Sequence, residues 1–193
     1  LSSYLASLEK LYQHQHLCAG YISMPRSTDL INLIKLGLCR FRTAACAPCR
    51  AVYETFPCME VDGLVDAQVM SYLLEPGERS TLFESRSKVT VDYPSHLRPW
   101  FCYLHVGVEV VRLEMPAWVA ASHESVARIC SVALDQAEKG GGYPVVLSEA
   151  HEQAVVKQAD RDFFYHLVAK VGRDMQRRLR LSPKLASKRS VRV

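Results

Sequence analysis

The sequence lacks the features that mark membrane and secreted proteins. None of its apolar runs approaches the roughly 18 residues that a membrane helix needs. The first residues show no basic segment followed by an apolar one, so they do not form a secretory signal. We therefore expect a cytoplasmic protein. Cys18, Cys102 and Cys130 lie in apolar contexts, and we expect them to be buried reduced thiols. The chain begins with Leu1 rather than Met, within a helical pattern, and we expect further sequence upstream of it.

Two common enzyme motifs are absent as well. The glycines Gly140–Gly142 follow a predicted helix rather than a strand, and no Lys-Ser or Lys-Thr pair comes after them, which excludes a P-loop. The chain contains no Gly-x-Ser-x-Gly segment and offers no Ser or Cys nucleophile triad. P-loop NTPases and hydrolases with a serine nucleophile elbow are therefore excluded.

The remaining pattern predicts a mixed α/β fold in which helices cover a sheet. A chain of 193 residues, 49% of them hydrophobic, can bury a sizeable core. Strand-like runs occupy 18–24, 100–106 and 108–115, and the last two turn at Gly107. Helical spacing of apolar residues occurs in the ranges 1–16, 28–36, 62–73, 122–139, 144–158 and 160–181.

Charge is distributed unevenly over this fold. We assign residues 1–181 to one domain, with a Cys-containing loop inserted at 39–58, an exposed loop at 84–98 and a basic tail at 182–193. Residues 170–193 hold nine Lys or Arg against one acid, a local charge of +8, whereas the whole chain carries +4. A basic end on a mildly acidic body suits contact with a polyanion. A solvated, poorly ordered tail would explain the same charges.

Acidic residues at element ends are candidates for metal-dependent phosphodiester chemistry, because Mg²⁺ and Mn²⁺ prefer carboxylate ligands. Asp62 and Asp66 are four residues apart and share one face of a helix that begins near Asp62. An N-cap beside a solvated acid is the structural alternative. Glu114 ends an apolar strand, a common place for a metal ligand, two residues after Arg112 on the same strand face. A simple Arg112–Glu114 ion pair explains that position equally well.

His151 is the one chemical group in the segment that follows the triple glycine. It lies beside an apolar stripe of Leu147, Ala150 and Ala154, about two helical turns after Tyr143. A His in this position can bind a metal, transfer a proton or contact a phosphate. A histidine that is hydrogen-bonded at the edge of the core remains the alternative.

Four cysteines crowd the inserted loop, in the order Cys39-x₆-Cys46-x₂-Cys49-x₈-Cys58. Four thiolates can enclose a structural Zn²⁺ tetrahedrally, although a zinc ribbon would offer two C-x₂-C pairs and this loop has one. Redox-active cysteines and plain loop cysteines are the alternatives. Thiolates are too soft for a catalytic Mg²⁺ or Mn²⁺, so a metal here would be structural.

Four segments, in order along the chain, resemble the NurA-domain family of nucleases. They are AGYISMPRSTDLINL at 19–33, LEPGERS at 74–80, VVRLEMPAWVA at 110–120, and the stretch from Gly142 to Val156 that contains GYP and EAHEQAVV. The basic segment SPKLASKR at 182–189 resembles the close of that family's sequences. Together these matches are specific and span nearly the whole chain.

The resemblance implies a ribonuclease-H-like core, with a mixed sheet flanked by helices, and a Mn²⁺- or Mg²⁺-dependent deoxyribonuclease. Such an enzyme cuts single strands and trims DNA ends 5′ to 3′ in double-strand-break repair. The implied partners are DNA, a hexameric HerA-type ATPase and a second copy of the chain, with no membrane involved. A catalytic carboxylate of the family lies on an upstream strand, so we expect the isolated chain to be inactive.

The resemblance also implies roles for individual residues. By order along the chain, Asp62 or Asp66 fits the family's later acidic metal ligand, Glu114 supports the same site, and His151 fits the family's C-terminal His. Asp29 is a further candidate ligand. The residues expected to contact DNA phosphates are Arg26, Lys184, Lys188 and Arg189. A non-catalytic adaptor that binds DNA or an ATPase and holds zinc in its Cys loop is the second hypothesis, and a redox module on Cys46 and Cys49 is the third.

Overall fold

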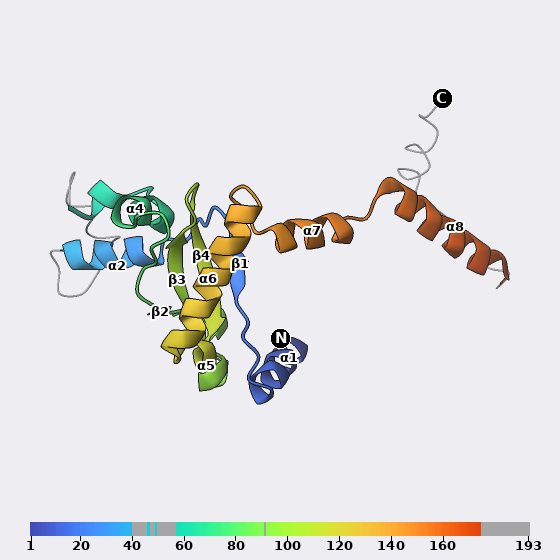
Figure 1. The fold of residues 1–193 in the computed structure, drawn as a ribbon, viewed down its shortest axis with the longest axis horizontal. Coiled ribbons are helices and arrows are strands. Elements are labelled where there is room, and N and C mark those ends of the chain that lie inside the picture. The colour runs from blue at the N-terminus through green and yellow to red at the C-terminus, as the bar shows by residue number, and fades with distance from the viewer. Residues whose placement is uncertain (40–45, 47–48, 50–56, 91, 175–193) are drawn as a thin grey trace, which may run out of the picture. The chain divides into compact units, whose positions relative to one another are not determined.

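The computed structural model describes residues 1–39, 46, 49, 57–90 and 92–174. They fall into two compact units, 1–148 and a unit that begins at Glu149. The first unit is a mixed α/β structure, as the sequence predicts (Figure 1). Its four described strands pair antiparallel throughout, whereas the resemblance implied a mixed sheet. Within the described ranges no helix is both long enough and apolar enough to cross a bilayer.

The strands of the sheet lie in the order β1-β4-β3-β2. Their bounds are Gly20–Ile22 for β1, Phe83–Glu84 for β2, Pro99–His105 for β3 and Val110–Pro116 for β4. The β3–β4 hairpin turns at Gly107, whose φ of +96° is readily adopted only by glycine. The two predicted strands on either side of Gly107 are thus confirmed. β2 begins one residue before the predicted loop 84–98 and overlaps it at Glu84.

Side chains alternate between the two faces of the sheet, and each face is covered by different helices. On one face, Cys102, Val111 and Leu113 pack against α5 (Ala117–Ala120) and α6 (His123–Lys139). On the other face, Phe101 and Tyr103 pack against Leu30 of α2 (Asp29–Leu38) and Met70 of α4 (Asp66–Leu73). The alternation along β4 places Arg112 and Glu114 on this second face, toward α2.

The helix predicted to start near Asp62 begins four residues later. A 3₁₀ turn, η1 (Pro57–Val61), precedes it, and Asp62 lies in the turn between the two elements. Val65 is the N-cap of α4, and its backbone N–H donates to the Gln68 side chain. Asp62 and Asp66 therefore do not share a helical face, because the chain between them is not helical.

Ser27, a residue type that often caps helices, directly precedes the helical range predicted at 28–36, but it does not cap α2. Thr28 is the N-cap residue and makes no capping hydrogen bond through its side chain. The Ser27 hydroxyl instead contacts the Tyr103 hydroxyl, 2.9 Å away. The capping role falls to a residue from another helix, as described below.

Helix α1 (Ser2–Gln13) packs against η3 (Ser95–Leu97), a short 3₁₀ turn that lies just before strand β3 in the sequence. His96 Nε2 lies 2.8 Å from Glu9 Oε2, and the His96 ring packs against the Tyr12 ring, tilted by 41°, with the ring centroids 4.6 Å apart. Tyr12 in turn lies 5.5 Å from Trp118 of α5. These contacts hold α1 beside η3, where both form part of a cleft wall.

The last two described helices are α7 (Val145–Ala154) and α8 (Gln158–Asp174). The predicted apolar stripe of α7 is not buried in the described structure, since Leu147 is 37% exposed. The apolar face of α8 is also exposed, and Phe163 reaches 65%. The predicted end of α7 at 158 extends past the observed end at Ala154. The predicted end of α8 at 181 lies outside the described part of the chain, which stops at residue 174.

Candidate functional site

A cleft of about 880 Å³ lies among α1, the start of α2, residues 85–90 and 93, and parts of strands β1 and β4. Four charged side chains line it: Arg26, Asp29, Arg112 and Glu114. The cleft lining thus contains two arginine side chains and two carboxylates. Hydroxyl groups of Ser27, Ser85, Ser87 and Thr90 line it as well. The polar wall is therefore built from segments far apart in the sequence.

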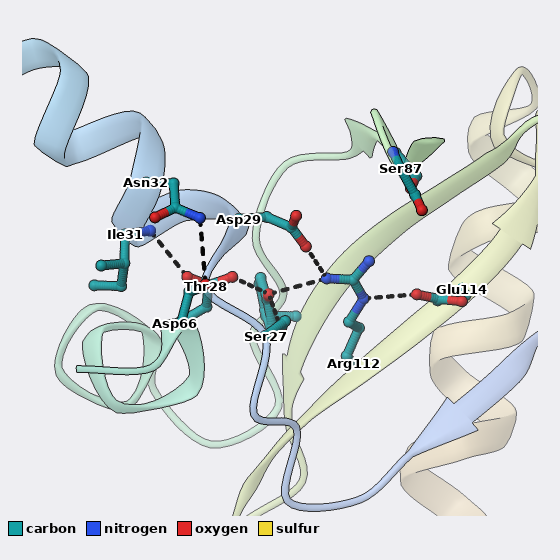
Figure 2. Close-up of polar contacts among 11 residues, drawn as sticks. Ser27, Thr28, Asp29, Ile31, Asn32, Asp66, Ser87, Arg112 and Glu114 are labelled. Carbon is teal, nitrogen blue, oxygen red and sulfur yellow. Dashed lines mark hydrogen bonds and ion pairs between the residues drawn. The ribbon is translucent and has the colours of Figure 1, made fainter. Parts of the chain in front are cut away.

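Arg112 is the centre of the charged group (Figure 2). Its Nη1 donates to Asp29 Oδ2 at 2.5 Å and its Nε donates to Glu114 Oε1 at 2.8 Å. The guanidinium carbon lies 3.6 Å from the centroid of the Phe101 ring, a cation–π contact. Burial disfavours the charged form, but the bond to Asp29 and the nearby Glu114 raise the pKa of Arg112 above its usual value. The Arg112 side chain is only 7% exposed, and its guanidinium remains charged.

Tyr103 connects Arg112 to a buried carboxylate. The Tyr103 hydroxyl donates to Asp66 Oδ2 at 2.7 Å and accepts a longer contact from Arg112 Nη1 at 3.4 Å. Burial and the hydrogen bond to Asp66 raise the pKa of Tyr103, so its hydroxyl stays protonated and keeps donating. The Ser27 hydroxyl supplies a further donor to Tyr103.

Asp66 caps α2 from a different helix. Its Oδ1 accepts the backbone N–H of Ile31, the third residue of α2, at 2.9 Å (Figure 2). The Asp66 N–H also donates to the Ser27 carbonyl at 2.9 Å. A carboxylate at a helix N-terminus is favoured both by the unpaired N–H groups and by the helix dipole. Both carboxylate oxygens are therefore engaged, and the residue is fully buried.

The described residues do not by themselves fit a complete divalent-metal centre. Within the described ranges no three His, Cys, Asp or Glu side chains come together as a metal site. Asp29 and Glu114 supply hard oxygen ligands at the cleft, with side chains 56% and 38% exposed, but Arg112 lies between them. Asp62 is half exposed and pairs with Lys35 at 2.5 Å. The metal roles of Asp62 and Asp66 remain predictions.

The NurA-domain family model matches residues 1–156 of the chain, about four-fifths of its length. The chain belongs to the NurA-domain family. NurA-domain proteins are nucleases of DNA repair, so the family membership supports a nuclease. Comparisons with curated proteins and with solved structures find no match. The matched range includes the whole cleft and the network from Asp66 to Arg112.

Two other residues of the predicted NurA site lie in described parts of the chain. Arg26 is exposed and lines the cleft, and its contact with DNA remains a prediction. His151 lies on the exposed surface of α7, in the second compact unit. Its proposed chemical role remains a prediction. The other predicted DNA contacts, Lys184, Lys188 and Arg189, lie outside the described residues.

The cysteines of the predicted zinc loop are described only in part, since most of the loop lies outside the described residues. Cys39 follows the last residue of α2, and Cys58 lies in η1. The zinc site remains a prediction. Of the cysteines expected to be buried and reduced, Cys102 and Cys130 are buried free thiols. Cys18 is half-buried and lines the cleft, and burial raises the pKa of its thiol.

The sequence did not reveal Tyr103, and it gave Arg112 only as a pairing partner of Glu114. One signal was available, because Arg112 interrupts an apolar strand and is too polar to be buried without partners. Its partners Asp29 and Tyr103 lie 83 and nine residues away along the chain. Only the Glu114 contact is local enough to be read from strand periodicity.

Proposed function

We propose that the protein is a metal-dependent deoxyribonuclease that processes DNA ends during double-strand-break repair. The observation that carries this proposal is the family match over residues 1–156. The resemblance of the motifs supports the finer parts: Mn²⁺ or Mg²⁺ as cofactor, single-strand cleavage, 5′ to 3′ trimming and a ribonuclease-H-like core. It also supports a HerA-type ATPase and a second copy of the chain as partners.

Asp29 and Glu114 are the acidic residues that the cleft presents to a substrate. Their half-exposed oxygens suit them to position a hydrated cation or the attacking water, which phosphodiester hydrolysis requires. Asp66 would have to release both Ile31 and Tyr103 in order to bind a cation. In this proposal Asp66 therefore supports the site from inside the fold, while His151 remains the proposed auxiliary ligand or proton-transferring group.

The test compares cleavage by the full-length protein and its variants on 5′-labelled single-stranded DNA with Mn²⁺. We expect Glu114→Gln and Asp29→Asn each to lower the rate by about 100-fold or more, since each removes a carboxylate from the reacting centre. Glu124→Gln is the matched control, because Glu124 is 85% exposed on α6, outside the cleft. Wild-type rates in both cleft variants would remove these two residues from the mechanism.

A non-catalytic adaptor that binds DNA or an ATPase is the second candidate function. It is favoured by the small number of acidic ligands that converge in the described ranges. The same assay separates the two functions, because an adaptor binds DNA without cleaving it in any divalent metal. Cleavage that EDTA abolishes and Mn²⁺ restores would exclude the adaptor.

A further inference from the structure

Arg112 retains one edge of its guanidinium that the protein does not use. A guanidinium carries five N–H donors. The Nε donor serves Glu114, and the two Nη1 donors serve Asp29 and the Tyr103 hydroxyl. The two donors on Nη2 have no partner among the described residues, and no dashed line reaches this nitrogen in Figure 2.

The unused edge is open to the cleft, although the side chain as a whole is nine-tenths buried. In the described part of the chain, the buried side-chain polar atoms without a partner are the Tyr21 hydroxyl, the Trp118 indole nitrogen and the Gln136 amide oxygen. The Nη2 of Arg112 is not among them, so solvent reaches it. Since Arg112 lines the cleft, the cleft is the route by which a ligand reaches this edge.

The guanidinium is held in place before any ligand arrives. Phe101 supports one of its faces, and Glu114 and Asp29 fix two of its three nitrogens. Tyr103 fixes the Nη1 side and is itself held by the buried Asp66. A side chain ordered in this way loses little conformational freedom on binding, which favours affinity.

The surroundings of the edge suit a phosphate. Two donors on a planar guanidinium match phosphate oxygens, which arginine binds more specifically than lysine does. The Ser87 hydroxyl accepts a long contact from the Val89 N–H, and its own hydrogen has no acceptor among the described residues. Arg26 adds a second positive charge to the cleft and, with Arg112, balances Asp29 and Glu114.

We propose that Arg112 binds a phosphate of the DNA strand through its Nη2 edge, with Ser87, which lines the same cleft, as a hydroxyl donor. The proposal rests on the proposed function in taking DNA as the ligand. It assigns Arg112 to direct contact with the substrate, whereas Tyr103 and Asp66 are positioning residues that act through it. A purely structural ion-pair centre is the competing explanation of the same contacts.

The test measures binding of single-stranded DNA by fluorescence anisotropy in EDTA, where cleavage does not interfere, over a range of salt concentrations. Loss of one phosphate contact lowers the slope of log K against log salt by about 0.7 for a single strand. We expect this change in Arg112→Gln, with an affinity about ten-fold weaker, as for loss of one charged hydrogen bond. Arg128→Gln is the control: it removes the same charge from the exposed surface of α6 and should leave the slope unchanged.

Arg112→Lys covers the case in which Arg112→Gln does not fold. It keeps the charge and should keep the slope, but it loses the paired donors and should bind several-fold more weakly. Neutral methylphosphonate linkages, placed one at a time in the DNA, identify the contact. At one position, the neutral linkage should weaken DNA binding by the wild-type protein. The same linkage should have little further effect on DNA binding by Arg112→Lys or Arg112→Gln.

Two outcomes would overturn the proposal. The first is an unchanged slope in a folded Arg112→Gln protein, which would make Arg112 purely structural. The second is that, at every position, the loss of affinity caused by the methylphosphonate linkage adds fully to the loss caused by the Arg112 variant. Failure of the proposed function would look different, since DNA would then bind as described here without being cleaved in Mn²⁺.

Discussion

Tyr103 and Tyr21 lie on opposite faces of one sheet, and only the first has its hydroxyl hydrogen-bonded in the described structure. Tyr103→Phe removes the donor to the buried Asp66 carboxylate, so we expect the free energy of unfolding to fall by about 1–3 kcal/mol. Tyr21→Phe removes a buried hydroxyl that has no partner among the described residues, so stability should stay the same or rise. Urea unfolding followed by circular dichroism measures both changes.

Each variant is the control for the other, because both remove one phenolic hydroxyl group and leave the aromatic ring in place. Equal losses in the two variants would contradict the hydrogen-bond network from Asp66 to Arg112. The dependence of the unfolding free energy on urea concentration is the further check. A change in this slope, rather than in the urea midpoint, would show that the variant alters the compactness of the native or the denatured state and not a single interaction. Tyr103→Phe should also weaken DNA binding if Tyr103 positions Arg112.

At the scale of helices and strands, elements with local signals were predicted well. The β3–β4 hairpin follows from Gly107 between two apolar runs, and α6 begins after Ser122, whose side chain accepts from the Ser125 N–H. The start of α4 was wrong because Asp62 resembles a cap, whereas the Val65 N–H pairs with Gln68. A sequence pattern shows that an acid can cap a helix, but it does not show that Asp62 caps none here or that Asp66 caps α2 instead of α4.

Elements whose partners are distant were predicted less well. Strand β2 has two residues and pairs with β3 alone, so it owes its conformation to tertiary contact rather than to propensity. The apolar stripe around Leu147 on α7 was expected to be buried and is exposed in the described structure. Helical periodicity shows that a face is apolar, but it does not show what covers that face.

The turn between α6 and α7 requires a glycine at position 140. A Cβ on Gly140 would lie 1.8 Å from the Tyr143 carbonyl oxygen, so Gly140→Ala has to shift the backbone. We expect it to lower the free energy of unfolding by more than about 1 kcal/mol. Gly37→Ala, in α2, meets no atom within 4 Å and should raise stability by about 0.4–1 kcal/mol, because alanine favours the helix. Thermal unfolding of the two variants should therefore shift in opposite directions.

At the scale of the whole molecule, the cleft shows why the candidate site was only partly predictable. Glu114 was named from its place at a strand end, and it does line the cleft. Asp66 was named from its spacing to Asp62, yet it lies inside the fold, because α4 meets the N-terminus of α2. Asp29 and Tyr103 reach Arg112 from separate elements. Contacts of this range depend on how the elements pack, which periodicity does not encode.

The basic C-terminal end is a second region of the chain that is predicted to contact DNA phosphates. Residues 170–193 carry a local charge of +8, and Lys184, Lys188 and Arg189 are the residues predicted there to contact phosphates. The double variant Lys188→Gln/Arg189→Gln should lower the salt slope of single-strand binding by about 1.4, since each lost contact contributes about 0.7. Stability should stay unchanged.

The control for that variant is Lys139→Gln/Arg128→Gln, which removes one lysine and one arginine from the exposed surface of α6. Both double variants lower the net charge equally, so long-range attraction changes by a similar amount in each. A difference between the salt slopes of the two double variants would therefore come from direct contact with DNA phosphates. Equal slopes in the two variants would make the basic end a solvated tail, whereas a drop confined to Lys188→Gln/Arg189→Gln would place DNA against it.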